Sequence, residues 1–78
     1  MRKDDRAIKK GFEIGGAKNV EFVKHGNGYR RVVMVVGGKE RTVFKIPSTS
    51  TLDDAGLQRK ARNLARRLAK QDLDTLTW

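Results

Sequence analysis

Basic side chains recur at helical spacing along residues 57–70 of this 78-residue chain, and their chemistry suits the binding of phosphate groups. In a helix with about 3.6 residues per turn these side chains share one side. Along its middle lie Arg59, Arg62, Arg66 and Lys70, and beside them lie Lys60 and Arg67. No carboxylate occurs between Asp54 and Asp72, so the helix itself does not neutralise this charge. The pattern predicts a polyanionic partner.

A second group of basic residues lies in the segment 27–47, which carries five basic residues and one acidic residue. Its candidate nucleic-acid contacts are Arg30, Arg31, Arg41 and Lys45. Lys and Arg side chains neutralise phosphates and release the counterions that surround a nucleic acid. Because the whole chain carries a net charge of +9, we expect binding that weakens as salt is added.

The one histidine, His25, is a candidate general acid or base for RNA cleavage, with Lys24 or Arg30 to hold the phosphate. Glu21 is the nearest carboxylate, but strand geometry assigns it to another residue pair, so it does not orient His25. With one His and no Cys, a protein-only zinc site is not expected. We therefore expect a binding protein without cofactor or metal rather than an enzyme.

The basic line requires an amphipathic helix over residues 57–70 to position it. Its opposite side is apolar, and the residues predicted to be buried there are Leu57, Ala61, Leu64, Ala65 and Leu68. Thr51 and Asp54 match a capping box in outline, and Asp53 and Asp54 are interpreted as capping residues rather than as a metal pair. Gly56 weakens the first turn, so the firm helix is predicted to begin at Leu57.

Three strands are predicted before this helix, at residues 19–25, 29–36 and 40–46, joined by turns at Gly26-Asn27-Gly28 and Gly37-Gly38. In the third strand the alternation places Thr42, Phe44 and Ile46 on one face and Arg41, Val43 and Lys45 on the other. The fold class is therefore α+β: a short N-terminal helix, a three-stranded antiparallel meander and a long C-terminal helix (αβββα).

The two ends of the chain are less strongly patterned. Residues 1–10 form either a short helix that stops at Gly11 or a flexible basic arm over 1–11, and both interpretations stay open. Phe12 and Ile14 are expected to pack on the core. Residues 71–78 form an apolar tail in which Trp78 docks on the body or, alternatively, stacks on a partner.

Length and composition indicate one domain over 1–78. The N-terminus lacks the apolar segment of a signal peptide, and no run approaches the ~20 apolar residues of a membrane span. We expect a cytoplasmic protein that does not bind membranes. An edge strand of the sheet offers a route to a homodimer or a protein partner.

The stretch KARNLARRLA at residues 60–69 resembles the last helix of double-stranded-RNA-binding domains, where a basic stretch leads into an Asn- and Ala-rich helix. The matching residues are Ala61, Arg62, Asn63, Ala65, Leu68 and Ala69. The resemblance implies an αβββα fold, with Gln58, Arg59 and Arg62 at phosphate-contacting positions. The chain departs from the pattern in placing Asp53 and Asp54 before the basic residues.

Residues 47–68, PSTSTLDDAGLQRKARNLARRL, also resemble the end of small bacteriophage proteins related to HicA-type mRNA interferases, which share the same order of elements. This resemblance implies RNA cleavage by a histidine that opens the second strand after a Gly-rich turn. Here that position holds Tyr29, and His25 lies on the other side of the turn.

Residues 24–46, KHGNGYRRVVMVVGGKERTVFKI, are similar to the three-stranded sheet of phage integrase arm-binding domains, where Asn-Gly and an aromatic residue begin one strand and Gly-Lys begins the next. That similarity implies a sheet laid in the major groove of DNA with a helix behind it. Arg31, Arg41 and Lys45 would then face the DNA.

The leading hypothesis is a small basic protein that binds duplex RNA or DNA, mainly through phosphate contacts from the last helix and the basic strand residues. Single strands are disfavoured because their binders usually array several aromatic platforms on a sheet. Three alternatives stay open: a sheet-in-groove DNA binder, a phage-type inhibitor of an acidic host protein, and a HicA-like RNA-cleaving toxin that uses His25.

Overall fold

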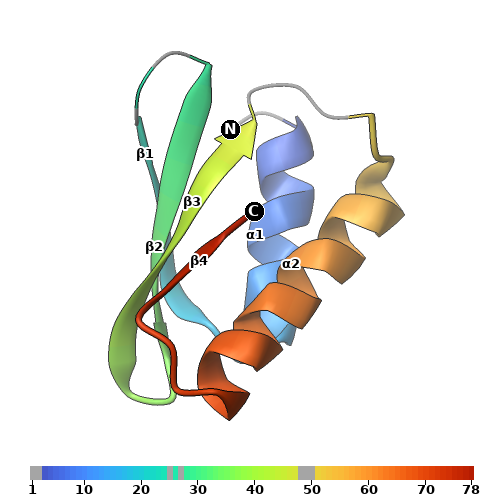
Figure 1. Ribbon diagram of the computed structural model, residues 1–78. Helices are drawn as coiled ribbons and strands as arrows, with labels where there is room; N and C mark the ends of the chain where they lie inside the picture. Colours follow the sequence, from blue (N-terminus) through green and yellow to red (C-terminus); the bar gives the residue numbers. More distant parts are fainter. Residues whose placement is uncertain (1–2, 25, 27, 48–50) are drawn as a thin grey trace.

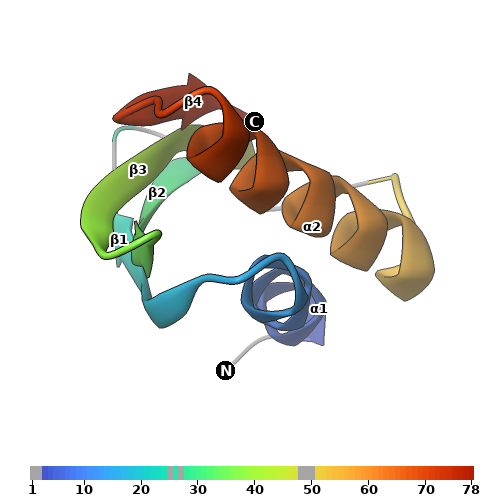
Figure 2. The same cartoon turned by 90° about the horizontal axis from the view of Figure 1, so that it is seen from below.

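A computed structural model describes residues 3–24, 26, 28–47 and 51–78 as one α+β unit in two layers. Its elements are α1 (Lys3–Ile14), β1 (Lys18–Lys24), β2 (Tyr29–Val36), β3 (Lys39–Pro47), α2 (Asp54–Lys70) and β4 (Thr75–Thr77). Figures 1 and 2 show both helices on the same face of the sheet. The predicted order of helix, three-stranded meander and helix is confirmed. None of the helices in the described segments is long and apolar enough to cross a membrane.

The sheet has one more strand than predicted. Its order is β1-β2-β3-β4, in which the first three strands are antiparallel and β4 runs parallel to β3. The tail over 71–78 therefore contains a short strand that the sequence did not predict, and the edges of the sheet are β1 and β4. The turn between β2 and β3 is the predicted Gly37-Gly38, and both residues have positive φ angles of 63° and 75°.

The helix-facing side of β3 does not follow simple alternation. Val43 and Ile46 are both fully buried, although they are three positions apart rather than two or four. Arg30 pairs with Ile46 and Val32 with Val43, so β3 has one more residue than β2 between these two pairs. This extra residue and the positive φ of Lys45, 58°, indicate a β-bulge. The predicted face of Ile46 was wrong because this extra residue turns Ile46 back toward the core.

The core lies between the helices and the sheet. Its largest fully buried side chains come from every element except β1 and β4: Ile8, Phe12, Val32, Met34, Val36, Val43, Ile46, Leu57 and Leu68. Val20, Phe22, Leu73, Leu76 and Trp78 pack around its margin. The predicted apolar side of α2 is confirmed, since all five of its residues are buried.

Helix α1 is longer than predicted and is not a loose arm over its described residues. Gly11 does not end it; the helix continues to Ile14, and Gly11 is buried. Phe12 is fully buried as expected, whereas Ile14 is 47% exposed and does not pack on the core. The helix continues because Gly11 serves as a close contact with α2, a role that local sequence does not distinguish from a stop.

Helix α2 begins at Asp54, three residues before the predicted Leu57. Its N-cap is Asp53, whose Oδ1 accepts a hydrogen bond from the Gly56 N–H at 2.7 Å. The capping interpretation of Asp53 is confirmed, while Thr51 does not occupy the N-cap position. The cap and the buried face together offset the weak helix propensity of Gly56.

Candidate nucleic-acid interface

Helix α2 holds its basic residues on the side opposite its buried face. Arg59, Arg66, Arg67 and Lys70 are exposed, and Lys60 and Arg62 are half-buried. From Arg59 to Lys70 the line extends roughly 17 Å at the rise of an α-helix. We call these six residues, Arg59, Lys60, Arg62, Arg66, Arg67 and Lys70, the α2 cations.

None of the α2 cations has an acidic partner within the described part of the chain. The ion pairs there involve Lys3, Arg30, Lys39 and Arg41 instead. An unpaired row of charge on one rigid helix produces a concentrated positive potential. This arrangement can bind several phosphates at once without first breaking an internal ion pair.

The α2 cations divide toward two flanks of the helix. Lys60 and Arg67 line a groove of about 490 Å³ on the β4 side, and the Lys60 Nζ lies 4.8 Å from the centroid of the Trp78 ring. Arg62 lies on the α1 side, where it lines a smaller hollow with Gln58 and Arg59. Lys60 therefore already contacts an aromatic ring, and Arg59 is the residue that lines the hollows on both flanks.

Arg30 is a structural residue. Its guanidinium forms an ion pair with buried Asp5, donates to the Pro47 carbonyl oxygen at 3.0 Å, and lies 5.3 Å from the centroid of the Phe22 ring. These contacts join α1, β1 and β3 around one side chain. The expectation that Arg30 belongs to the nucleic-acid interface is therefore not supported, because a phosphate contact would require them to break.

Arg41 is likewise internal. Only 4% of its surface is exposed, and its Nε donates to the Val36 carbonyl oxygen at 2.9 Å. Its two terminal nitrogens bond the Leu73 carbonyl oxygen at 2.6 Å and Asp72 at 3.1 Å. The expectation that Arg41 faces DNA on the sheet surface is wrong, because the side chain anchors the α2–β4 connection instead.

Arg31 and Lys45 remain outside the core, and Arg31 lies away from α2. Arg31 pairs with Val23 and alternates with the buried Val32, which places it on the sheet face opposite the helices. The residues that alternate onto this open face include Glu21, Val23, Arg31, Val33, Val35 and Thr42. The face combines valines with charged and polar side chains, and no helix of the described residues covers it (Figure 2). Arg31 and the α2 cations therefore cannot meet one straight duplex together.

The catalytic candidate, His25, lies outside the described residues. No group of three or more His, Cys, Asp or Glu side chains in the described segments is placed to hold a metal ion. Asp53 acts as a helix cap and Asp54 lies 4.0 Å from the Lys3 Nζ, so both carboxylates have structural contacts.

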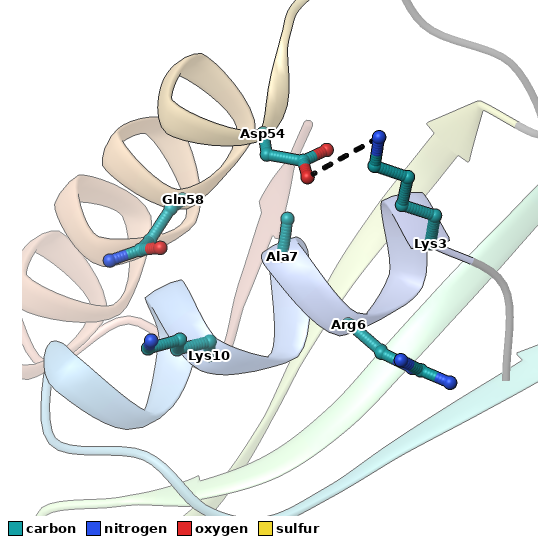
Figure 3. A pocket seen from close by; sticks show the side chains of 6 residues that line it. All are labelled: Lys3, Arg6, Ala7, Lys10, Asp54 and Gln58. Atoms are coloured by element: carbon teal, nitrogen blue, oxygen red, sulfur yellow. Dashed lines mark ion pairs between the residues drawn. The ribbon is translucent and has the colours of Figure 1, made fainter.

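Sequence reasoning missed the basic residues that α1 brings beside α2. Lys3, Arg6 and Lys10 line a groove with Asp54 and Gln58 across from them (Figure 3). Their spacing of three and then four residues was the available signal, since it places all three on one side of a helix. That signal required residues 1–10 to be taken as a helix.

Comparison of the chain with protein-family models, with curated proteins and with solved structures finds no match.

Proposed function

We propose that this protein binds duplex nucleic acid through phosphate contacts made by the exposed side of α2. The observation that carries the proposal is the row of α2 cations, which have no acidic partner in the described segments. Lys and Arg in a row match the regular charge of a phosphate backbone. If four phosphates are contacted, raising the salt from roughly 50 to 200 mM should reduce the affinity about a hundredfold.

A duplex is the preferred ligand because the molecule offers charge rather than stacking platforms. Tyr29 is 48% exposed at the start of β2, but the central part of the open face presents valines. Single-strand binders rely on several aromatic rings in such positions. Binding by the sheet in a DNA groove is less favoured, because Arg41 is internal and the open face has few groups that can hydrogen-bond to base edges.

The test is fluorescence anisotropy with matched double-stranded RNA, double-stranded DNA and single-stranded RNA, each titrated at several salt concentrations. Arg59→Gln/Arg66→Gln removes two exposed α2 cations. Lys18→Gln/Lys24→Gln is the matched control, because it removes the same charge from exposed positions on β1. Circular dichroism confirms that each variant is folded.

We expect salt-dependent duplex binding that falls roughly tenfold in the α2 variant and much less in the β1 variant. Equal losses in the two variants would show that only net charge matters, and would contradict an interface on α2. Absence of binding to all three nucleic acids would reject the proposal and leave an acidic protein as the alternative partner. A gel of the recovered RNA tests cleavage, which His25→Ala would abolish in a HicA-like enzyme.

A further inference from the structure

The two helices together enclose a basic groove that neither forms alone. Lys3, Arg6 and Lys10 line it from α1, and Asp54 and Gln58 line it from α2, around a volume of about 560 Å³. Figure 3 shows Lys3 and Lys10 reaching toward α2, while Arg6 extends from the flank of α1. Ala7 contributes only a methyl group at its centre, so the groove stays open between its banks.

This groove continues into the surface that carries the α2 cations. A second hollow of about 200 Å³ is lined by Ala55, Gln58, Arg59 and Arg62. Gln58 lines both the groove and this hollow. The basic residues of α1 therefore share one continuous surface with Arg59 and Arg62 of α2. A chain of phosphates that follows α2 would therefore have positive charge on both sides.

We propose that this inter-helix groove and the adjoining hollow together bind the sugar–phosphate backbone of one strand of the duplex, with Arg6 and Lys10 on the α1 bank of the groove and Arg59 and Arg62 in the hollow on α2. The proposal rests on the proposed function and extends the interface to a second helix. A phosphate presents two free oxygens, which can accept charge-assisted hydrogen bonds from both banks. The Gln58 amide, which lines both the groove and the hollow, can donate to a phosphate as well.

One carboxylate opposes binding at the end of the groove. Asp54 lies there with 53% of its side chain exposed, and its Oδ2 is 4.0 Å from the Lys3 Nζ. A carboxylate at the groove repels a phosphate that binds there, and its pairing with Lys3 also occupies a cation of the groove. Removing this charge should therefore strengthen binding. The N-cap of α2 is Asp53, so Asp54→Asn leaves the cap in place.

The experiment uses the full chain and the duplex that the wild-type protein binds best. Arg6→Gln/Lys10→Gln replaces two cations of the groove by glutamine, which is a good helix former. Lys18→Gln/Lys24→Gln is again the charge-matched control. Asp54→Asn is compared with Glu40→Gln, which neutralises an exposed carboxylate on β3. Thermal melts monitored by circular dichroism establish that all four variants fold.

We expect the affinity of the α1 variant to fall roughly tenfold, and the slope of log affinity against log salt to become shallower by about one unit for each phosphate that the variant no longer neutralises. Asp54→Asn should bind about three times more tightly than wild type, while Glu40→Gln changes little. The gain from Asp54→Asn cannot arise from misfolding, so it keeps the proposal testable if the α1 variant proves unstable.

The groove proposal is overturned if wild type binds and the α2 variant loses affinity, while the α1 variant matches its control and Asp54→Asn matches Glu40→Gln. In that outcome the proposed function stands and the phosphate-binding residues are confined to α2. If wild-type protein binds no duplex, both proposals fail. If wild type binds the duplex and only the α1 variant loses affinity, while the α2 variant does not, the interface lies on α1 and the two-bank groove is rejected.

Discussion

Gly11 on α1 packs directly against the backbone of Gln58 on α2. A Cβ added to Gly11 would lie 2.2 Å from the Gln58 carbonyl oxygen and 2.8 Å from the Ala61 Cβ. One turn along, a Cβ on Gly15 would lie 2.7 Å from the Ala65 Cβ and 2.7 Å from the Arg62 carbonyl oxygen. The two backbones can approach closely because Gly11 in α1 and Gly15 just after it face Ala61 and Ala65 on α2.

We predict that Gly11→Ala destabilises the protein by about 1–3 kcal/mol, because the methyl group must push the helices apart. Urea unfolding monitored by circular dichroism measures this change. Gly56→Ala is the comparison, because it makes the same substitution within a helix where the nearest atom is the flexible Asp53 carboxylate at 3.1 Å. A Gly11→Ala protein as stable as wild type would contradict the packing of the two helices.

The same relationship explains why the sequence did not reveal the length of α1. Gly after a short polar helix usually indicates a C-terminal stop, and the residues around Gly11 give no local signal to the contrary. The requirement for Gly comes from Gln58 and Ala61, which lie more than forty residues away in the chain. The basic groove depends on this packing, so the α1 half of the candidate site could not be predicted either.

Arg41 offers a second test, because it satisfies backbone carbonyls at two places in the chain. We predict that Arg41→Met loses about 2–4 kcal/mol of stability, since the carbonyl oxygens of Val36 and Leu73 lose their donor. Arg41→Lys should not restore it, because an ammonium group lacks the planar fork that reaches both carbonyls and Asp72.

The measurement for Arg41 is the free energy of unfolding in urea, with Lys45→Met as the control on the same strand. Lys45 is exposed, so its replacement should change stability little. Duplex affinity of folded Arg41→Met should equal that of wild type. A stable variant with reduced affinity would return Arg41 to the nucleic-acid interface.

The strands show which features local pattern can specify. Tyr29–Val36 matched its predicted bounds, because β-branched residues between two glycine-containing turns are a strong signal. The bulge at Lys45 and the strand β4 were missed. Thr75–Thr77 becomes a strand only because Thr42 N–H can bond the Asp74 carbonyl oxygen and Trp78 N–H the Phe44 carbonyl oxygen. Such pairing depends on tertiary placement rather than on a three-residue sequence.

The exposed pair Lys39–Asp74 makes stability depend on pH at both extremes. The Lys39 Nζ lies 2.6 Å from the Asp74 Oδ1. The hydrogen bond and charge of Lys39 lower the pKa of Asp74 below its ordinary 3.8, and the hydrogen bond to Asp74, with the charges of Asp72 and Asp74, raises the pKa of Lys39 above 10.5. The stabilisation from Asp74 is therefore present above pH 3.8 and lost as pH falls through its folded pKa.

For Lys39 the sign is opposite: its stabilisation is present below pH 10.5 and lost as pH rises through its folded pKa. We predict that Asp74→Asn lowers the melting temperature slightly at neutral pH, and that the difference from wild type disappears in acid and in high salt. Melting curves across pH measure this. Glu13→Gln, which removes an exposed carboxylate from α1, is the control. Its difference in melting temperature from wild type should not disappear in acid and in high salt; if it does, the pH dependence arises from net charge rather than from the Lys39–Asp74 pair.

Trp78 forms a contact that links the core to the α2 cations. Its ring lies 6.4 Å from the Phe12 ring in an edge-on arrangement, and the Lys60 Nζ lies 4.8 Å from the centroid of the Trp78 ring. We predict that Trp78→Ala costs about 2 kcal/mol of stability, because it removes apolar burial and the aromatic pair. Trp78→Phe should retain most of it, because a smaller ring can still contact Phe12.

A double-mutant cycle separates the interaction of Lys60 with Trp78 from the rest. Lys60→Gln alone should cost about 0.5–1 kcal/mol, and it should cost less once Trp78→Ala is present, because the ring that attracts the ammonium is gone. Free energies of unfolding for wild type, the two single variants and the double variant give the coupling. Strict additivity would contradict a cation–π contact, and would leave Lys60 as available for a phosphate as the exposed Arg59 and Arg66.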